Sequence, residues 1–78
     1  MERPDFDPRD EAAQALDQIE IHVQSRLGHR LSQFRLVVHD HGLVLRGRAR
    51  TWYAKQLVQH AVMEATALPI LANEIEVL

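Results

Sequence analysis

The sequence predicts an α+β domain in which two helices cover one face of a three-stranded mixed sheet, in the order helix–strand–strand–helix–strand. Two apolar stripes with helical spacing and three segments of alternating apolar residues support this fold class. The chain has 78 residues, the size of one small domain. It contains no cysteine, so a disulfide or a thiolate metal site is excluded, and association with a second subunit remains an option for adding stability.

The first helix is expected to begin at Asp7-Pro8, where an acidic lead-in over residues 1–8 gives way to the domain over residues 9–78. Asp7 can cap free N–H groups, and Pro8 suits the first helical position. Apolar residues then recur three or four positions apart, at Ala12, Leu16, Ile19, Val23 and Leu27. Gly28 follows this stripe and can end the helix in the left-handed conformation.

Two strands are expected next, over residues 34–39 and 43–49. Their alternating residues predict one buried face, and these are Phe34, Leu36, Val38, Leu43, Leu45, Gly47 and Ala49. The segment His39-Asp40-His41-Gly42 has the composition of a tight hairpin turn, with positive φ expected at Gly42. Gly47 is predicted to be structural, because a side chain there would meet a helix that crosses the sheet.

Thr51 is expected to cap the second helix, and Pro69 to stop it. The predicted core-facing stripe of this helix comprises Ala54, Leu57, Val58, Ala61, Ala65 and Leu68. The last strand follows, and its alternating residues are Leu71, Asn73, Ile75 and Val77.

These elements resemble the BON domain, a small bacterial αββαβ module. The resemblance runs from about Ala12 to Leu78 and rests on five motifs: Leu36-x-Val38, Asp40-x-Gly42, Leu43-x-Leu45-x-Gly47, Tyr53-Ala54-Lys55-Gln56-Leu57 and Asn73-x-Ile75-x-Val77. The chain departs from the family pattern at Leu68-Pro69-Ile70, where Gly-Val is common, and its hairpin turn is about one residue shorter than the usual form.

The resemblance implies a binding or scaffolding module without catalytic chemistry. BON domains are associated with phospholipid surfaces, osmotic-stress proteins, secretins and a potassium-binding protein. The expected partner is therefore an anionic lipid surface or a protein. The alternative is a structural domain that forms a homodimer through the outer face of its second helix.

Charge and hydropathy exclude other partners. The net charge is −2 and the pI about 6.2, which argues against a general nucleic-acid binder. The first eleven residues carry −3 and the rest +1. No apolar run approaches the roughly 20 residues needed to span a bilayer. The N-terminus lacks the pattern of a secretory signal, so a complete chain is expected to be cytoplasmic.

The outward side of the hairpin carries the candidate anion-binding residues Arg35, Arg46, Arg48 and Arg50. Guanidinium groups can make two-pronged contacts with the phosphates of lipids or nucleotides. The alternative is an ion-paired face, because Glu74 and Glu76 are also expected to point outward and can pair with these arginines across the sheet. The strand order decides between the two, and the sequence alone leaves it open.

The second helix is predicted to carry a candidate interface on the side opposite its core stripe. This interface comprises Trp52, Gln56, Gln59 and Met63. Trp and Met are enriched in protein interfaces, so an exposed pair of them suggests association or membrane contact. The alternative is that Trp52 folds back over the edge of the sheet. On the first helix, Ile21 also falls outside the core stripe.

Metal binding and catalysis find little support. Of the five histidines, His39 and His41 flank the turn, but two ligands are too few for a structural tetrahedral site. No metal or other cofactor is therefore expected, and a metal or small-ion sensor is the weakest alternative. Ser25 and Ser32 lack a Gly-x-Ser-x-Gly context, and no glycine-rich phosphate loop exists, so the chain is not expected to be an enzyme.

Overall fold

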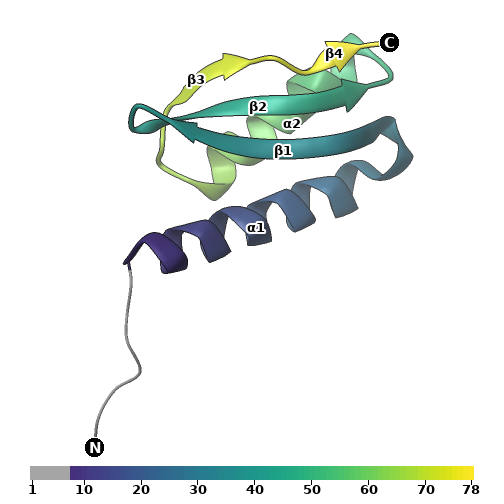
Figure 1. The fold of residues 1–78 in the computed structure, drawn as a ribbon. Helices are drawn as coiled ribbons and strands as arrows, with labels where there is room; N and C mark the ends of the chain where they lie inside the picture. The colour runs from purple at the N-terminus through teal and green to yellow at the C-terminus, as the bar shows by residue number, and fades with distance from the viewer. Residues whose placement is uncertain (1–7) are drawn as a thin grey trace, which may run out of the picture.

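The computed structural model describes residues 8–78, with side chains described from residue 15 onward. It confirms the α+β fold, with helices packed against a mixed sheet (Figure 1). The predicted cap at Asp7 lies outside the described residues, and the side chain of Ala12, predicted for the core, lies outside the described side chains. The elements, in chain order, are α1 (Pro8–Leu27), the short 3-10 helix η1 (Gly28–Arg30), β1 (Leu31–His39), β2 (Gly42–Ala49), α2 (Trp52–Ala65), β3 (Ile70–Asn73) and β4 (Glu76–Val77).

The sheet is centred on β2, which pairs antiparallel with β1 and parallel with both β3 and β4. The single last strand that the sequence predicts is thus divided in two around Glu74 and Ile75. Asn73 accounts for the break, because its side-chain oxygen accepts a hydrogen bond from the Ile75 N–H (3.2 Å). The backbone N–H of Glu74 still donates to Leu45 O (2.8 Å), so the segment stays attached to β2.

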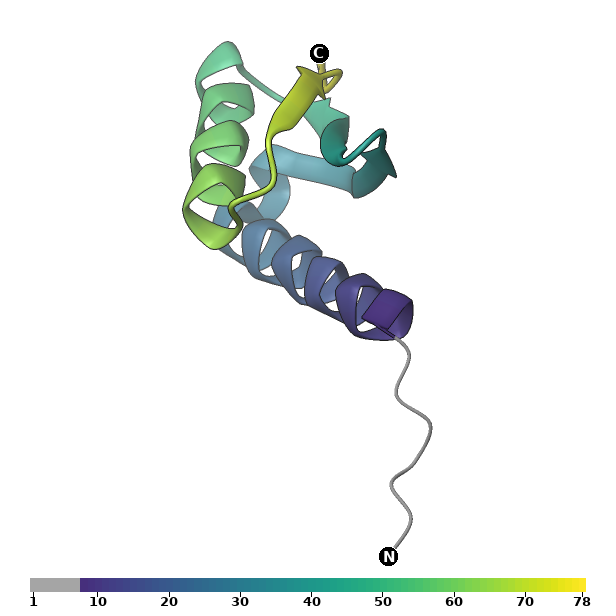
Figure 2. The same cartoon turned by 90° about the vertical axis from the view of Figure 1, so that its left-hand side faces the viewer.

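Both helices lie on one side of the sheet. Figure 1 shows α1 running alongside β1 and α2 behind the strands, and Figure 2 shows α2 to the left of the strands and α1 below them. The core between them is apolar, and its largest fully buried side chains are Leu31, Leu43, Leu45, Ile75, Val23, Val58 and Val62. No described helix or loop packs on the opposite face of β2, β3 and β4, which we call the outer sheet face.

The end of α1 follows the prediction. Leu27 is buried, and Gly28 has φ +61°, the left-handed conformation that glycine adopts without steric cost. Arg30 adds a second cap, because its Nε donates to Leu27 O (3.1 Å) at the end of the helix. Leu16 and Ile19 pack partly buried against the core, as their spacing predicts.

The end of α2 differs from the prediction. The helix stops at Ala65 rather than at Leu68, and Thr66 is already extended. Leu68 is therefore not part of the core stripe and is exposed, as is Ala65, while Val62 is fully buried instead. At the other end, Thr51 caps the helix as predicted, its hydroxyl accepting from Ala54 N (3.0 Å).

The hairpin differs from the prediction in its turn. The two central residues, Asp40 and His41, have φ +48° and +70°, the pattern of a type I′ turn, while Gly42 has an ordinary φ. Gly42 instead leaves room for Leu71, since a Cβ at residue 42 would lie 2.5 Å from the side chain of Leu71, which would have to shift. Val38 is also wrong as a core residue, being 56% exposed near the hairpin end.

A β-bulge interrupts the pairing of β1 with β2. Ser32 pairs with Arg48 and Arg35 with Arg46, so two residues of β1 oppose Gly47 alone. Gly47 has φ +152°, and a Cβ on it would lie 3.1 Å from Phe34 Cα and from Ser32 O. The glycine is thus structural, as predicted, but its close neighbour is the backbone of β1 and not a crossing helix.

Candidate functional site

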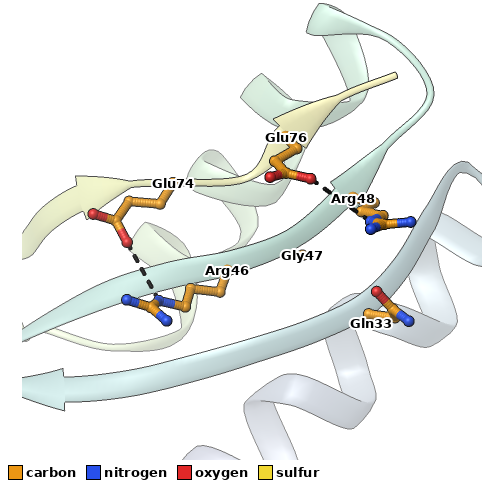
Figure 3. Close-up of a pocket in the computed structure, with 6 residues that line it drawn as sticks. All are labelled: Gln33, Arg46, Gly47, Arg48, Glu74 and Glu76. Atoms are coloured by element: carbon orange, nitrogen blue, oxygen red, sulfur yellow. Dashed lines mark ion pairs between the residues drawn. The ribbon is translucent and has the colours of Figure 1, made fainter.

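The outer sheet face carries a polar hollow of about 470 Å³ over the bulge. Figure 3 shows Arg46 and Arg48 on either side of Gly47, with the two carboxylates of the last strands beside them. Because Gly47 has no side chain, its backbone forms part of the hollow's wall. The lining residues are Gln33, Arg46, Gly47, Arg48, Glu74 and Glu76.

Ion pairs neutralise the arginines of this hollow. Arg46 Nε lies 3.3 Å from a Glu74 carboxylate oxygen, and Arg48 Nε lies 3.7 Å from Glu76 (Figure 3). All four side chains are more than half exposed, so each pair stabilises the fold only weakly. The pairs do, however, leave little net positive charge on the outer sheet face.

Arg35 is also paired, with a residue of α1. It lies directly across the ladder from Arg46, a repulsive arrangement of like charges. Glu20 relieves this repulsion, since its carboxylate lies 3.7 Å from Arg35 Nη1. Glu20 also accepts a hydrogen bond from the backbone N–H of Leu36 (3.1 Å), a donor of the edge strand β1. This carboxylate therefore closes part of the sheet edge, which edge strands otherwise leave open to other chains.

The predicted set of four arginines is therefore not a free cationic cluster. Arg46 and Arg48 pair with Glu74 and Glu76, as the ion-paired alternative predicts, whereas the pairing of Arg35 with Glu20 was not predicted. Among the ion pairs of the described residues, none involves Arg50, whose backbone N–H donates to Arg30 O (3.1 Å). Arg50 is thus the one predicted arginine whose charge stays uncompensated within that part of the chain.

The outer side of α2 agrees with the prediction for three of its four residues. Trp52 is 64% and Met63 57% exposed, and Gln56 is exposed as well. The alternative in which Trp52 folds back over the sheet is therefore wrong. The Lys55 ammonium lies 4.9 Å from the centre of the indole ring, a cation–π distance.

Gln59 differs from the prediction because it belongs to a hydrogen-bonded contact between α2 and the sheet. Its side-chain oxygen accepts from Asn73 Nδ2 (3.2 Å), which also approaches Lys55 O (3.4 Å). Gln59 is accordingly half-buried. Asn73, predicted to be structural, thus joins helix, strand and strand break, a role that helical periodicity could not reveal.

An apolar groove of about 430 Å³ lies beside Met63 at the end of α2. Its walls include Leu68, Pro69 and Ile70 from the segment that leads into β3. The sequence pattern missed this groove, because it placed Leu68 in the helix and in the core. Tyr53, 69% exposed next to Trp52, was missed as well, although its position outside the apolar stripe was a usable signal.

Other predicted features stay isolated. Ile21 is exposed, as predicted, and lines a second shallow apolar groove with Phe34. His39 Nε2 lies 3.2 Å from Asp40 at the hairpin turn. Among the side chains that the structure describes, from residue 15 onward, no three His, Asp or Glu side chains gather closely enough to hold a metal ion. No described helix is long and apolar enough to cross a membrane.

Comparisons with known proteins add no further constraint. A scan against protein-family models, a search of curated proteins and a search of solved structures each found no match to this chain.

Proposed function

We propose that this chain is a non-catalytic binding module of the BON type, which contacts a protein partner through the outer face of α2. The contact surface consists of Trp52, Gln56 and Met63 together with the groove beside Met63. The observation that carries the proposal is the exposure of Trp52, 64% in a chain with one tryptophan.

Tryptophan and methionine are suited to this role. Both are enriched at interfaces, and tryptophan is among the residues that most often dominate binding energy. Trp52 and Met63 are eleven residues apart on one helix, which corresponds to about 16 Å along its axis. A partner can therefore use two apolar anchors with the polar Gln56 between them.

The charge distribution favours a protein over an anionic lipid surface. Attraction to anionic lipids grows with the number of unpaired basic residues near the membrane. Arg35, Arg46 and Arg48 each lie within 4 Å of a carboxylate, so they add little to such attraction. Catalysis is not proposed, because the sequence has no cysteine and no nucleophile or phosphate-loop motif.

Quantitative affinity capture tests the proposal. The tagged wild-type chain and a Trp52→Ala/Met63→Ala variant are exposed to lysate from the native cells, with Ile21→Ala as the matched control. Ile21 is equally exposed, at 62%, but lies on α1. We expect a partner that the control retains and the α2 variant loses, and purified titration of that partner should reproduce the difference. Equal capture by both variants would contradict the proposal.

Vesicle co-sedimentation tests the lipid alternative in the same set of proteins. Salt-sensitive binding to anionic but not neutral vesicles, lost in Arg50→Ala and kept in the α2 variant, would replace the protein partner by a lipid surface. Self-association of the purified chain that disappears in the α2 variant would instead make a second copy the occupant of this face.

A further inference from the structure

The outer sheet face has a charge pattern that is complementary to itself. Two columns of side chains run side by side along it, because residues paired across parallel strands share a face. The β2 column contains Val44, Arg46 and Arg48. The β3–β4 column contains the residues beside them, Ala72, Glu74 and Glu76. One column is therefore positive and its neighbour negative, and both are apolar at the same end.

Only one kind of two-fold axis stacks two such faces favourably. Consider an axis that is parallel to the strands and lies between the two columns. Rotation about it places the β2 column of one copy over the β3–β4 column of the other and leaves each residue at the same height along the strands. It sets Arg46 of one copy over Glu74 of the other, Arg48 over Glu76, and Val44 over Ala72. A two-fold axis in the plane of the interface but perpendicular to the strands would place each column over the same column of the second copy. Arginines would then oppose arginines, and the charged end of each column would cover the apolar end of the other copy's column.

We propose that two copies of this chain associate face to face through their outer sheet faces, about a two-fold axis that is parallel to the strands and lies between the β2 column and the β3–β4 column. The proposal does not depend on the function proposed above. Sheets that pack face to face keep their strands within about 30° of one another, which this axis permits. The interface is isologous, so each complementary contact occurs twice.

The hollow over Gly47 provides room for the partner's carboxylates. It measures about 470 Å³ and lies between Arg46 and Arg48. The internal ion pairs approach these guanidinium groups at Nε. Since a guanidinium has five N–H donors, its terminal nitrogens can bind a carboxylate of the second copy at the same time.

The size of the face implies a weak dimer. Eight residues of β2 span about 26 Å, and the two facing columns span about 10 Å, so each copy offers about 260 Å². A standard interface buries about 800 Å² on each partner. We therefore expect a weak dimer, whose dissociation constant rises several-fold between about 50 and about 500 mM salt, as exposed charges require. In this dimer both α2 helices face outward, so it would present two copies of the α2 contact surface.

Sedimentation equilibrium with charge-reversed variants tests this arrangement. The first variant carries Arg46→Glu and Arg48→Glu, and the second carries Glu74→Arg and Glu76→Arg. We expect the wild type to self-associate, each variant alone to be monomeric, and an equimolar mixture to form a one-to-one dimer. A monomeric wild type at 1 mM, or variants that self-associate as the wild type does, would overturn the proposal.

A third variant guards against loss of the fold. It combines all four substitutions, so the internal ion pairs are kept with their directions exchanged. We expect it to self-associate like the wild type but not to bind a fluorescently labelled wild-type chain, because like columns would then meet. Binding of this variant to the wild-type chain would overturn the face-to-face arrangement. Loss of self-association in a separate Trp52→Ala variant would overturn it as well, because Trp52 lies outside the proposed interface.

Discussion

Replacing Gly47 by alanine puts a Cβ against the backbone of the neighbouring strand. The Cβ would lie 3.1 Å from both Phe34 Cα and Ser32 O, at a φ of +152° that residues with a side chain rarely adopt. Unfavourable backbone conformations cost about 1–3 kcal/mol, and overpacking against groups that cannot move costs a similar amount. We expect Gly47→Ala to lower the free energy of unfolding by about 2–6 kcal/mol.

Gly28→Ala is the matched control for this measurement. Gly28 also has a positive φ, +61°, but no atom lies within 4 Å of the Cβ position. Its substitution should cost about 1 kcal/mol, from the backbone conformation alone. Urea unfolding followed by far-UV circular dichroism compares the two variants. A Gly47→Ala variant as stable as Gly28→Ala would refute the steric role of the bulge.

Three further predictions concern single contacts. Glu20→Ala should lower the free energy of unfolding by about 1–3 kcal/mol and promote concentration-dependent aggregation, because the backbone N–H of Leu36 on the edge strand loses its acceptor. Unchanged light scattering would contradict this. In urea unfolding, Asn73→Ala should lower the free energy of unfolding by about 2 kcal/mol, and Thr51→Ala by about 1 kcal/mol. A larger loss for Thr51→Ala would be evidence against the Asn73 contact. His41→Gly should raise the melting temperature by a few degrees, because glycine fits φ +70° in the turn; a lower value would contradict the type I′ assignment.

Much of the fold follows from periodicity, because apolar spacing is set by which face meets the core. The stripe through Leu16, Val23 and Leu27 predicts the contact face of α1, and alternation predicts the buried Leu43 and Leu45 of β2. Gly28 as a helix end also follows from the sequence, since few other residues adopt that conformation there.

What the sequence did not predict depends on distances between segments far apart in the chain. The bulge opposite Gly47 requires the register of β1 on β2, and the contact of Gly42 with Leu71 requires the path into β3. Periodicity reports which face a residue occupies and says nothing of these approaches. The error at Val38 has the same origin, because alternation continues past the end of the covered sheet.

The candidate site was predictable in composition but not in electrostatics. The sequence identifies Arg46 and Arg48 as outward-facing, yet their pairing with Glu74 and Glu76 depends on strand order. Gln59 likewise falls on the outer side by helical angle, but its bond to Asn73 decides its environment. Trp52 is where pattern and structure agree most closely, since no later segment of the chain covers it.

Chemical-shift mapping tests most directly whether the outer face of α2 is the contact surface. The ¹⁵N-labelled chain is titrated with the partner obtained by affinity capture, and backbone and indole signals are followed. Shifts concentrated on Trp52, Gln56 and Met63, with Ile21 and the hairpin turn unchanged, are the predicted result. Shifts that spare α2 and cluster elsewhere on the chain would contradict the proposed function.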